Sequence, residues 1–224
     1  MVISENFARC IARISGDGYL YYRYIRYSNK CPELIREFKE DMVSEFGGIN
    51  FTEGISNSGT PFVQVHGKNL IKKFTNYLED YRSTSIKIPN EIKQGSKRLK
   101  SVYLRALYDD EGCATLRLNN NTKEWKRNLT LCSNSIMLLK EVEGILVSTF
   151  KIKTNKIIRN KNAIKDRCYV LAITGKDNFN KFKEKIGFLS PRKRKRLEMI
   201  IISYDSTSKN KISFEKLKRE LLIP

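Results

Sequence analysis

Two acids in this chain stand directly before a glycine, Asp17 in "ISGDGYL" and Glu111 in "LYDDEGC". Each follows apolar residues at helical spacing, so each is expected at the C-terminal end of a helix. A helix end carries unpaired carbonyl groups and partial negative charge, which disfavour a carboxylate unless a cation joins it. Asp17 and Glu111 are therefore candidate ligands of a divalent metal, beside the backbone carbonyls of Gly16 and Asp110. Mg²⁺, or Mn²⁺ in its place, accepts oxygen ligands of this kind.

The same two helices carry small residues through which they could pack together. Ala12 and Gly16 lie four residues apart, as do Ala106 and Asp110. Two helices that pack together through these faces of small side chains would bring both acids close to one phosphate group. An acid–glycine pair taken alone is more often an ordinary helix end, so the case for a site depends on the chain carrying two of them.

An internal repeat supports the pairing. The segment "FVQVHGKNLIKKF" from Phe62 to Phe74 resembles "VLAITGKDNFNKF" from Val170 to Phe182. In each, an alternating strand leads into Gly-Lys and then into an amphipathic helix. The two acid–glycine pairs precede these segments in the same order, which indicates one duplicated module.

The elements expected around the acids follow one order, α-β-β-α-β-β-α, twice. Helices are expected over residues 4–18, 32–47, 68–81, 96–112, 135–150 and 176–187, and strand pairs over 19–28, 49–66, 113–133 and 151–174. The predicted boundaries are a first module over 1–82, a linker over 83–95, a second module over 96–189, and a C-terminal helix and basic tail over 190–224.

Charge points to a polyanionic partner. The chain has 224 residues, with 43 Lys and Arg against 24 Asp and Glu, a formal net charge of +19. Nucleic acid is the commonest partner of such a surface, with a merely soluble basic protein or an acidic membrane surface as the alternatives. No apolar run approaches the ~18 residues that a membrane span requires. Five cysteines without a C-x-x-C pair argue against a zinc finger or a secreted disulfide framework.

Two nine-residue segments resemble a known family signature. "CIARISGDG", from Cys10 to Gly18, and "LRALYDDEG", from Leu104 to Gly112, are similar to the motifs of two-motif, single-chain LAGLIDADG homing endonucleases, especially those encoded in archaeal ribosomal-RNA introns. "IPNEI", "ITGKDNFNKF" and "IGFLSPRKRKRLE" also look like family segments. The resemblance implies an α+β fold of duplicated αββαββα modules with pseudo-twofold symmetry. Its two antiparallel sheets would form a DNA-binding saddle.

The resemblance also implies an activity: site-specific cleavage of both strands of duplex DNA across the minor groove, leaving short 3′ overhangs. Asp17 and Glu111 would bind the divalent metals, and Lys30 would be a third catalytic residue that orders solvent. The residue of the second module that is expected to correspond to Lys30 is Ser133, which is not basic. The alternatives are that Lys126 or Lys123 of the neighbouring hairpin substitutes for it, or that one strand is cut more slowly.

Strand alternation suggests which side chains face DNA. Thr115, Arg117 and Asn119 share one face of a strand, as do Lys126, Asn128 and Thr130 on the next; a solvated polar face is the alternative. In the first module the expected contacts are Tyr19, Tyr21, Arg23 and Arg26. Lys151, Lys153 and Arg159 belong to a basic segment expected to contact the DNA backbone.

Three other features have simpler interpretations. The run "RKRKR", from Arg192 to Arg196, is expected to be a solvated helix start near DNA phosphate; a nuclear localisation signal is the alternative. His66 is expected at the surface or facing DNA. Trp125 is expected to be a packing residue.

Two other functions remain open. The same fold would also suit an RNA maturase that assists intron splicing, or a non-catalytic DNA-binding regulator. The presence of both acids argues against the regulator and, weakly, against the maturase. The favoured partner is duplex DNA with a long asymmetric recognition site. The protein is expected to bind it as a monomer and to bind no membrane. Intron RNA is a possible further partner. The expected location is the cytoplasm of a prokaryote, an archaeon by resemblance, or an organelle.

Overall fold

A computed structural model describes residues 3–78, 83–119, 124–159 and 168–204 of the chain. The helices are α1 (Glu5–Ser15), α2 (Pro32–Phe46), α3 (Lys68–Thr75), α4 (Asn90–Gln94), α5 (Lys97–Glu111), α6 (Ile136–Ser148), α7 (Lys176–Lys185) and α8 (Pro191–Ile202). The strands are β1 (Gly18–Leu20), β2 (Tyr24–Ser28), β3 (Phe51–Ile55), β4 (Pro61–His66), β5 (Gly112–Leu118), β6 (Trp125–Ser133), β7 (Ile158–Arg159) and β8 (Tyr169–Ile173). The α+β class and the repeated element order are confirmed.

Each module contributes one antiparallel sheet, with the strand orders β1-β2-β4-β3 and β5-β6-β8-β7. The registers of the two sheets correspond. Gly18 lies opposite Tyr27 in the first sheet, and Gly112 lies opposite Leu131 in the second. Because both sheets start from the glycine after the acid, residues of the two modules can be equated position by position.

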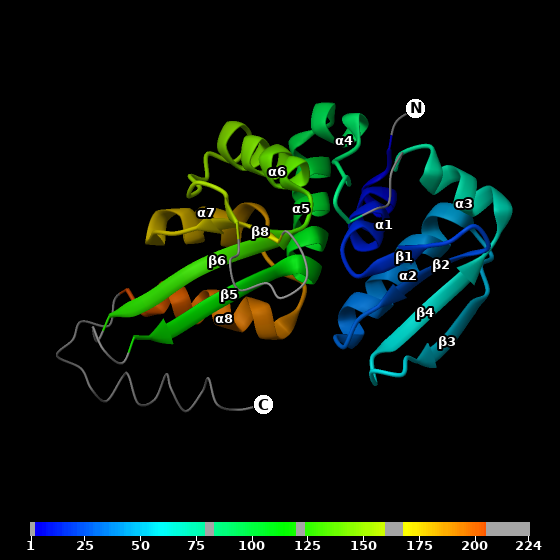
Figure 1. Cartoon of the computed structure of the whole chain (residues 1–224), viewed down its shortest axis with the longest axis horizontal. Coiled ribbons are helices and arrows are strands. Elements are labelled where there is room, and N and C mark those ends of the chain that lie inside the picture. The colour runs from blue at the N-terminus through cyan, green and yellow to red at the C-terminus, as the bar shows by residue number, and fades with distance from the viewer. Residues whose placement is uncertain (1–2, 79–82, 120–123, 160–167, 205–224) are drawn as a thin grey trace.

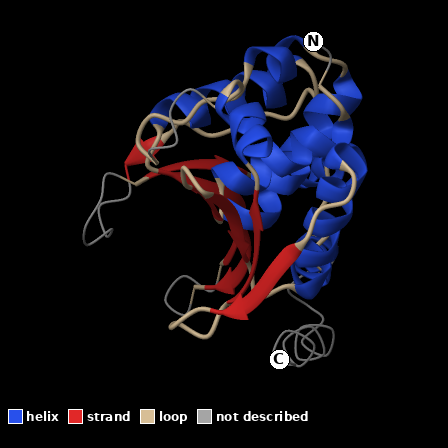
Figure 2. Cartoon of the chain, turned by 90° about the vertical axis from the view of Figure 1, so that its right-hand side faces the viewer, coloured by secondary structure: helices blue, strands red, loops and turns tan. Residues whose placement is uncertain are grey.

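The two sheets line one concave face, and the helices cover the other side (Figure 2). On β2 and β4 the inward residues Ile25, Tyr27, Val63 and Val65 are buried. The residues between them, such as Arg26 and Gln64, point to the concave face, as the two-residue period of a strand requires. The expected saddle is therefore present.

Helices α1 and α5 lie side by side at the centre of the molecule (Figure 1). Ser4 and Ser96 accept the N–H groups of Phe7 and Leu99, which fixes the start of each helix. A Cβ at Gly16 would lie 2.8 Å from the Cβ of Asp110, so only glycine permits this approach. The predicted packing on small residues is confirmed.

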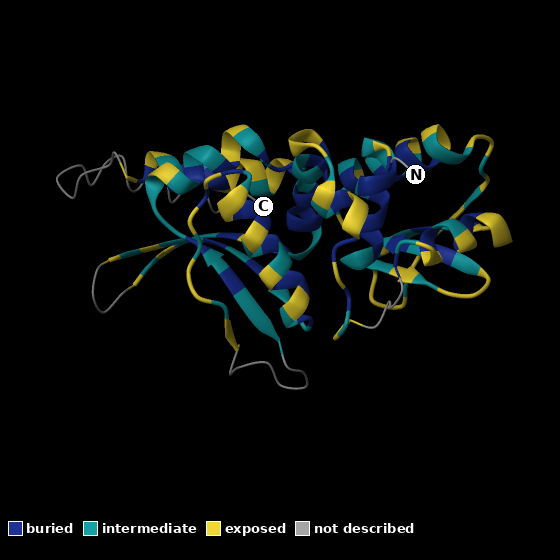
Figure 3. Ribbon diagram, turned by 90° about the horizontal axis from the view of Figure 1, so that it is seen from above, coloured by how far each residue is buried: buried dark blue, intermediate teal, exposed yellow. Residues whose placement is uncertain are grey.

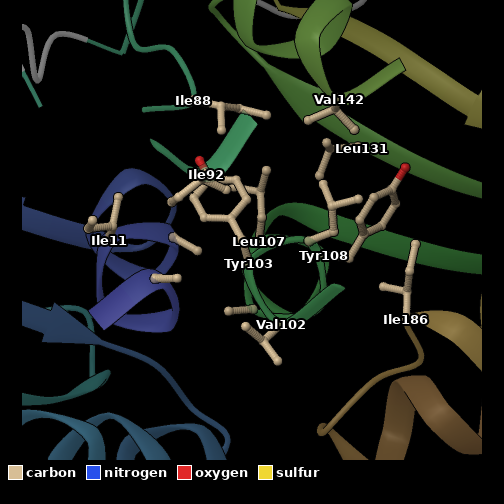
Figure 4. Close-up of a cluster of buried hydrophobic side chains, with 14 of the residues drawn as sticks. Ile11, Ile88, Ile92, Val102, Tyr103, Leu107, Tyr108, Leu131, Val142 and Ile186 are labelled. Atoms are coloured by element: carbon tan, nitrogen blue, oxygen red, sulfur yellow. The ribbon is translucent and has the colours of Figure 1, made fainter. Parts of the chain in front are cut away.

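The core surrounds this pair of helices. Figure 4 shows α5 in the middle, with Ile11 of α1 on one side and Val142 and Ile186 on the other. Buried residues concentrate where the two helices meet (Figure 3). The packing of α1 and α5 in the core thus fixes the positions of their C-terminal ends.

Some expectations need correction. α1 ends at Ser15 because Gly16 caps it, earlier than the expected Gly18. α3 ends at Thr75, short of residue 81, which lies outside the described residues. The expected linker holds a short helix, α4, and the module boundaries stay predictions. Within the described ranges no helix is long and apolar enough to cross a membrane. The tail over 205–224 lies outside them.

Candidate active site and nucleic-acid interface

Asp17 and Glu111 come together at the C-terminal ends of α1 and α5. Glu111 is the last residue of α5, and Asp17 follows Gly16, the cap of α1. Burial and the negative charge of Asp17 together raise the pKa of Glu111 to about 7, against the opposing charge of Lys193. The pKa of Asp17 is also raised by desolvation, against the opposing charges of Lys193 and Arg13. Two carboxylates held this close favour a proton or a cation between them.

Asp110 makes contacts through both its backbone and its side chain. Its carbonyl accepts a hydrogen bond from Lys193 Nζ at 3.2 Å, which uses one of the two lone pairs of that oxygen, and its place among the metal ligands stays a prediction. Its buried carboxylate accepts from Arg13 Nη1 at 2.8 Å and from the Tyr27 hydroxyl at 2.7 Å. Burial raises the pKa of Asp110 to about 7, although the charge of Arg13 opposes that rise.

Arg13 is the centre of a buried charge cluster between the modules. Its guanidinium is 1% exposed and pairs with Glu37 and Asp110, each at 2.8 Å. Burial alone would lower the pKa of Arg13, but the surrounding carboxylates raise it, so the group stays charged. Asp110 is therefore committed to joining α5 to the first module.

Asp109 and Lys193 make reciprocal hydrogen bonds between α5 and α8, since each side chain contacts the backbone at the end of the other helix. The Asp109 carboxylate accepts the backbone N–H groups of Leu189 and Ser190, each at 3.0 Å. Lys193 donates in return to the carbonyls of Tyr108, Asp109 and Asp110 at the end of α5. A cation at a helix C-terminus and an anion at a helix N-terminus are both favourable. Burial lowers the pKa of Lys193, and the nearby carboxylates oppose that shift.

A cavity of about 570 Å³ opens beside Asp17 and holds Asn29, Lys30, Asp110 and Lys193 in its wall. Asn29 Nδ2 donates to Asp17 Oδ2 at 2.9 Å and to Asp110 Oδ1 at 3.3 Å. Asn29 thus orients one acid of each module. Lys30, the expected third catalytic residue, is exposed at the same opening.

The expected counterpart of Lys30 is wrong by one residue. Asn29 Oδ1 accepts the N–H of Cys31 at 2.9 Å, and Ser133 Oγ accepts the N–H of Ser135 at 3.0 Å. Cys31 and Ser135 precede α2 and α6 in the same way, so Ser133 corresponds to Asn29. Lys30 therefore corresponds to Asn134, which is also not basic.

The donor set suits a hard cation that arrives with a phosphate. In the described ranges no group of three or more His, Cys, Asp and Glu is placed to hold a metal. Asp17 and Glu111 would supply two carboxylates, with the Gly16 carbonyl adjacent, and water and phosphate oxygens would complete the shell. The buried Oδ2 of Asp110 has no hydrogen-bond partner among the described residues, which leaves further negative charge at this end of α5.

On the first sheet, three of the four expected contacts share the concave face. Tyr19 pairs with Arg26, and Tyr21 bonds through its N–H to the carbonyl of Tyr24. Arg23 instead lies in the turn, where its guanidinium stacks over the ring of Tyr22 at 4.8 Å. His66 is exposed on the concave face, as expected.

On the second sheet the expected polar face is present. Thr115 lies opposite Asn128 and Arg117 opposite Lys126. Asn119 lies where β5 ends, its N–H bonded to the carbonyl of Glu124. These strands and Arg159 of β7 surround a shallow cavity of about 590 Å³ lined by Thr115, Lys126, Asn128, Thr130, Cys132, Ile158, Arg159 and Val170.

Lys151 and Lys153 lie apart from that face. They stand in the segment between α6 and β7, and the N–H of Lys153 donates to Asn178 of α7. Lys123 and residues 160–167 lie outside the described residues.

Lys193 and Asn29 are site residues that are absent from the expectations above. Charge alone does not distinguish Lys193 within the "RKRKR" run, but Lys193, Leu197 and Ile200 lie at i, i+4 and i+7 on one face of α8. That spacing indicated an inward Lys193. Nothing in the sequence around Asn29 indicated its contact with Asp17.

Comparison with known proteins agrees with this geometry. Residues 98–187 match the family model described as a LAGLIDADG-like domain. Mesophilic variants of the homing endonuclease I-DmoI are 20% identical with a TM-score of 0.62, covering 87% of this chain and 97% of theirs. I-DmoI in complex with DNA and Mn is 18% identical with a TM-score of 0.59, covering 82% and 96%. I-WcaI bound to its DNA recognition sequence is 17% identical with a TM-score of 0.56, covering 88% of both chains.

Curated relatives come from Methanocaldococcus jannaschii. A probable translation initiation factor IF-2 is 26% identical over 220 residues, 90% of this chain and 18% of that protein. A glutamine–fructose-6-phosphate aminotransferase is 22% identical, over 94% of this chain and 19% of that protein. The chain thus spans under a fifth of these relatives, whose names describe different activities. An uncharacterized protein of the organism is 26% identical, over 85% and 69%.

These findings define the class. Residues 98–187 match the LAGLIDADG-like domain, and the chain as a whole has the fold of the homing endonucleases I-DmoI and I-WcaI. The resemblance seen in the two motifs is confirmed.

Proposed function

We propose that the protein is a metal-dependent, site-specific endonuclease that cuts both strands of duplex DNA across the minor groove and leaves short 3′ overhangs. The observation that carries the proposal is the meeting of Asp17 and Glu111 at the ends of α1 and α5, between two sheets that line one concave face. The related structures with DNA and with Mn, Mg or Ca support duplex DNA and a divalent cation as the partners.

In this mechanism the basic concave face holds the duplex by its phosphates, which a net charge of +19 favours. Asp17 and Glu111 would hold Mg²⁺ or Mn²⁺, which when bound lowers the pKa of water and neutralises charge on the scissile phosphate. Asn29 keeps the carboxylate of Asp17 directed at the cavity. Lys30, at the opening, orders the attacking water and counters the phosphate charge.

The chain would act on DNA as a monomer, because its two modules supply both halves of the saddle. A maturase or a regulator on the same fold is less well supported. The I-DmoI and I-WcaI complexes described above contain DNA, which favours DNA over RNA as the partner. A regulator that does not cut DNA would have no need for the two metal-binding acids, Asp17 and Glu111.

The test uses plasmid DNA that carries the joined flanking sequences of the element encoding this chain. Incubation with Mg²⁺ should give linear product with short 3′ overhangs. Asp17→Asn and Glu111→Gln should each abolish cleavage while binding to the plasmid fragment persists. Glu184→Gln, an exposed acid on α7, is the matched control. Near-normal cutting by either motif variant at saturating Mg²⁺ would contradict the two-acid mechanism.

A further inference from the structure

The two concave sheet faces differ in chemistry at equivalent positions. Tyr27 corresponds to Leu131, and the next strand continues the match because Tyr27 pairs with Val63 and Leu131 with Leu171. The equivalent concave positions are Tyr19 and Cys113, Tyr21 and Thr115, Tyr24 and Asn128, Arg26 and Thr130, Phe62 and Val170, Gln64 and Ala172, and His66 and Thr174. Rings on the first sheet are replaced by small or hydrogen-bonding side chains on the second.

The rings of the first sheet form one continuous surface. Tyr19 and Tyr21 stack with centroids 6.0 Å apart, and Tyr24 lies 5.4 Å from Tyr21 and 5.9 Å from His66. Tyr19 is 53% exposed and Tyr21 is 39% exposed, so this surface is open to a partner. We call Tyr19, Tyr21, Tyr24, Phe62 and His66 the ring surface.

Phe62 and Arg26 fit into the same surface. A Cβ at Gly54 would lie 2.7 Å from the ring of Phe62, so glycine on β3 lets that ring lie flat across the sheet. The Arg26 guanidinium stacks on Phe62 at 4.2 Å and on Tyr24 at 5.3 Å. It also donates twice to Gln64 Oε1, at 2.9 and 2.6 Å. The charged group here is thus held within the apolar surface.

The second sheet presents hydrogen-bonding groups instead. Arg117 and Lys126 are exposed opposite each other, and Asn128 lies opposite Thr115. Arginine and lysine recognise guanine, and asparagine recognises adenine, through hydrogen bonds to base edges in the major groove. The half-site on this sheet is therefore expected to be recognised by polar contacts.

The ring surface presents mainly apolar ring carbon: both His66 nitrogens already contact Gln64 and the Arg23 carbonyl, and the tyrosine hydroxyls are its remaining polar ring groups. In a paired duplex the faces of the bases are covered by their neighbours, and only the base edges are open. The apolar group on the major-groove edge is the C5-methyl of thymine. Rings at five adjacent positions of one sheet therefore match a run of thymines better than a run of guanines or cytosines.

We propose that the first sheet recognises its half-site through thymine methyl groups on the ring surface, whereas the second sheet recognises its half-site by hydrogen bonds. This inference depends on the proposed function only in taking duplex DNA as the partner. It assigns the ring surface a role in specificity, and it makes the target asymmetric in chemistry as well as in sequence.

The test starts from a randomised duplex library, bound in Ca²⁺ by the Asp17→Asn protein and selected over several rounds. One half of the enriched site should be rich in thymine. That half is then synthesised with deoxyuridine in place of thymidine, which removes only the methyl groups. Each methyl lost should weaken binding about 4-fold, so the loss of three should weaken it roughly 60-fold, by the usual gain for burying one apolar carbon. The same replacement in the other half should change binding less than 2-fold.

Two variants assign the halves to the sheets. Tyr24→Asn installs the residue found at the equivalent position of the second sheet and should remove the effect of deoxyuridine at one position of the thymine-rich half. Asn128→Ala should relax base preference only in the other half. Thermal melting checks that both variants fold.

The outcomes separate the two claims. If no duplex is enriched, the proposed function fails and the inference fails with it. If a site is enriched but deoxyuridine has no effect in either half, only the inference is overturned. An equal effect in both halves would also overturn it, because the two sheets would then not differ.

Discussion

The three consecutive acids at the end of α5 have three separate tasks. Asp109 binds backbone N–H groups at the start of α8, and Asp110 pairs with Arg13 of α1. Only Glu111 is left to face the charge of Asp17, and its pKa is raised to about 7. We expect that a site arranged for a cation is unfavourable without one.

The first prediction follows from that cost. The pKa of Glu111 is raised from 4.5 to about 7, so the folded protein holds this proton more tightly than the unfolded chain. The stabilising contribution is present below about pH 4.5 and is lost as the pH rises through about 7. Glu111→Gln should therefore raise the melting temperature at pH 8 and change it little at pH 5, in the absence of metal. Glu184→Gln should show no such difference, and equal shifts at both pH values would contradict the expectation.

The second prediction concerns Lys30. Because Asn134 stands at the equivalent position, the two strands of the target should be cut with unequal assistance. Lys30→Met should slow one strand by roughly 10²–10⁴-fold, the usual value of such assistance, and nicked circles should accumulate on supercoiled plasmid. Asn134→Lys should shorten the lifetime of the nicked form, and Ser133→Lys should not. Equal slowing of both strands by Lys30→Met would mean that Lys30 acts on binding or folding.

At the scale of elements, the packing of α1 on α5 joins two unlike helices. Arg13 of α1 pairs with Asp110 of α5, while Gly16 leaves room for that carboxylate. The position of α5 equivalent to Arg13 is Leu107, so two copies of α1 would place their arginines without the matching acid. A buried pair of this kind is strongly destabilised by removal of one partner, whereas replacement of both partners by apolar residues is often neutral.

The third prediction is a double-mutant cycle on this pair. Arg13→Leu or Asp110→Ala alone leaves a buried charge unpaired and should cost about 3–5 kcal/mol of unfolding free energy. The double variant should cost much less than the sum, because no unpaired charge remains at that contact. Urea unfolding measures all four proteins. The exposed pair Arg36 and Glu40 is the control and should show no measurable coupling. Additive costs at Arg13 and Asp110 would contradict the pairing.

The elements were predictable to the extent that local patterns determine them. The helix periodicity and the glycines after both acids gave the element order and the central helix pair. Three-dimensional facts were not predictable in the same way. The spacing of Lys193 to Leu197 and Ile200 indicates that it faces inward, but not that it contacts the end of α5. The counterpart of Lys30 shifted by one because the β5–β6 hairpin is longer than β1–β2. The contact of Asp110 with Tyr27 joins residues far apart in the chain, which no local pattern reports.

At the scale of the whole molecule, duplication has given a symmetric frame with different halves. The sheets share strand order and register, whereas their concave side chains differ at each equivalent position compared above. Under the proposed function, a frame of this kind would bind an asymmetric duplex without a second protein chain, and its basic charge would contact both halves of the target.

The fourth prediction is a steep dependence of binding on salt. Each phosphate neutralised by the concave face releases counterion, so the logarithm of affinity should fall with the logarithm of salt at a slope of roughly −0.9 per contact. Fluorescence anisotropy on the target duplex in Ca²⁺ measures the slope, and sedimentation should show one chain per duplex. A flat response, or an obligate dimer on one duplex, would count against the saddle.

The mutual contact of Asp109 and Lys193 has a consequence for protein engineering. Removal of the chain after residue 189 would look like the trimming of a terminal extension. It would instead leave the Asp109 carboxylate without the Ser190 N–H and the last carbonyls of α5 without the Lys193 ammonium. Glu111 follows those carbonyls directly, so a shortened protein should lose cleavage through a loosened active site while its sheets stay intact.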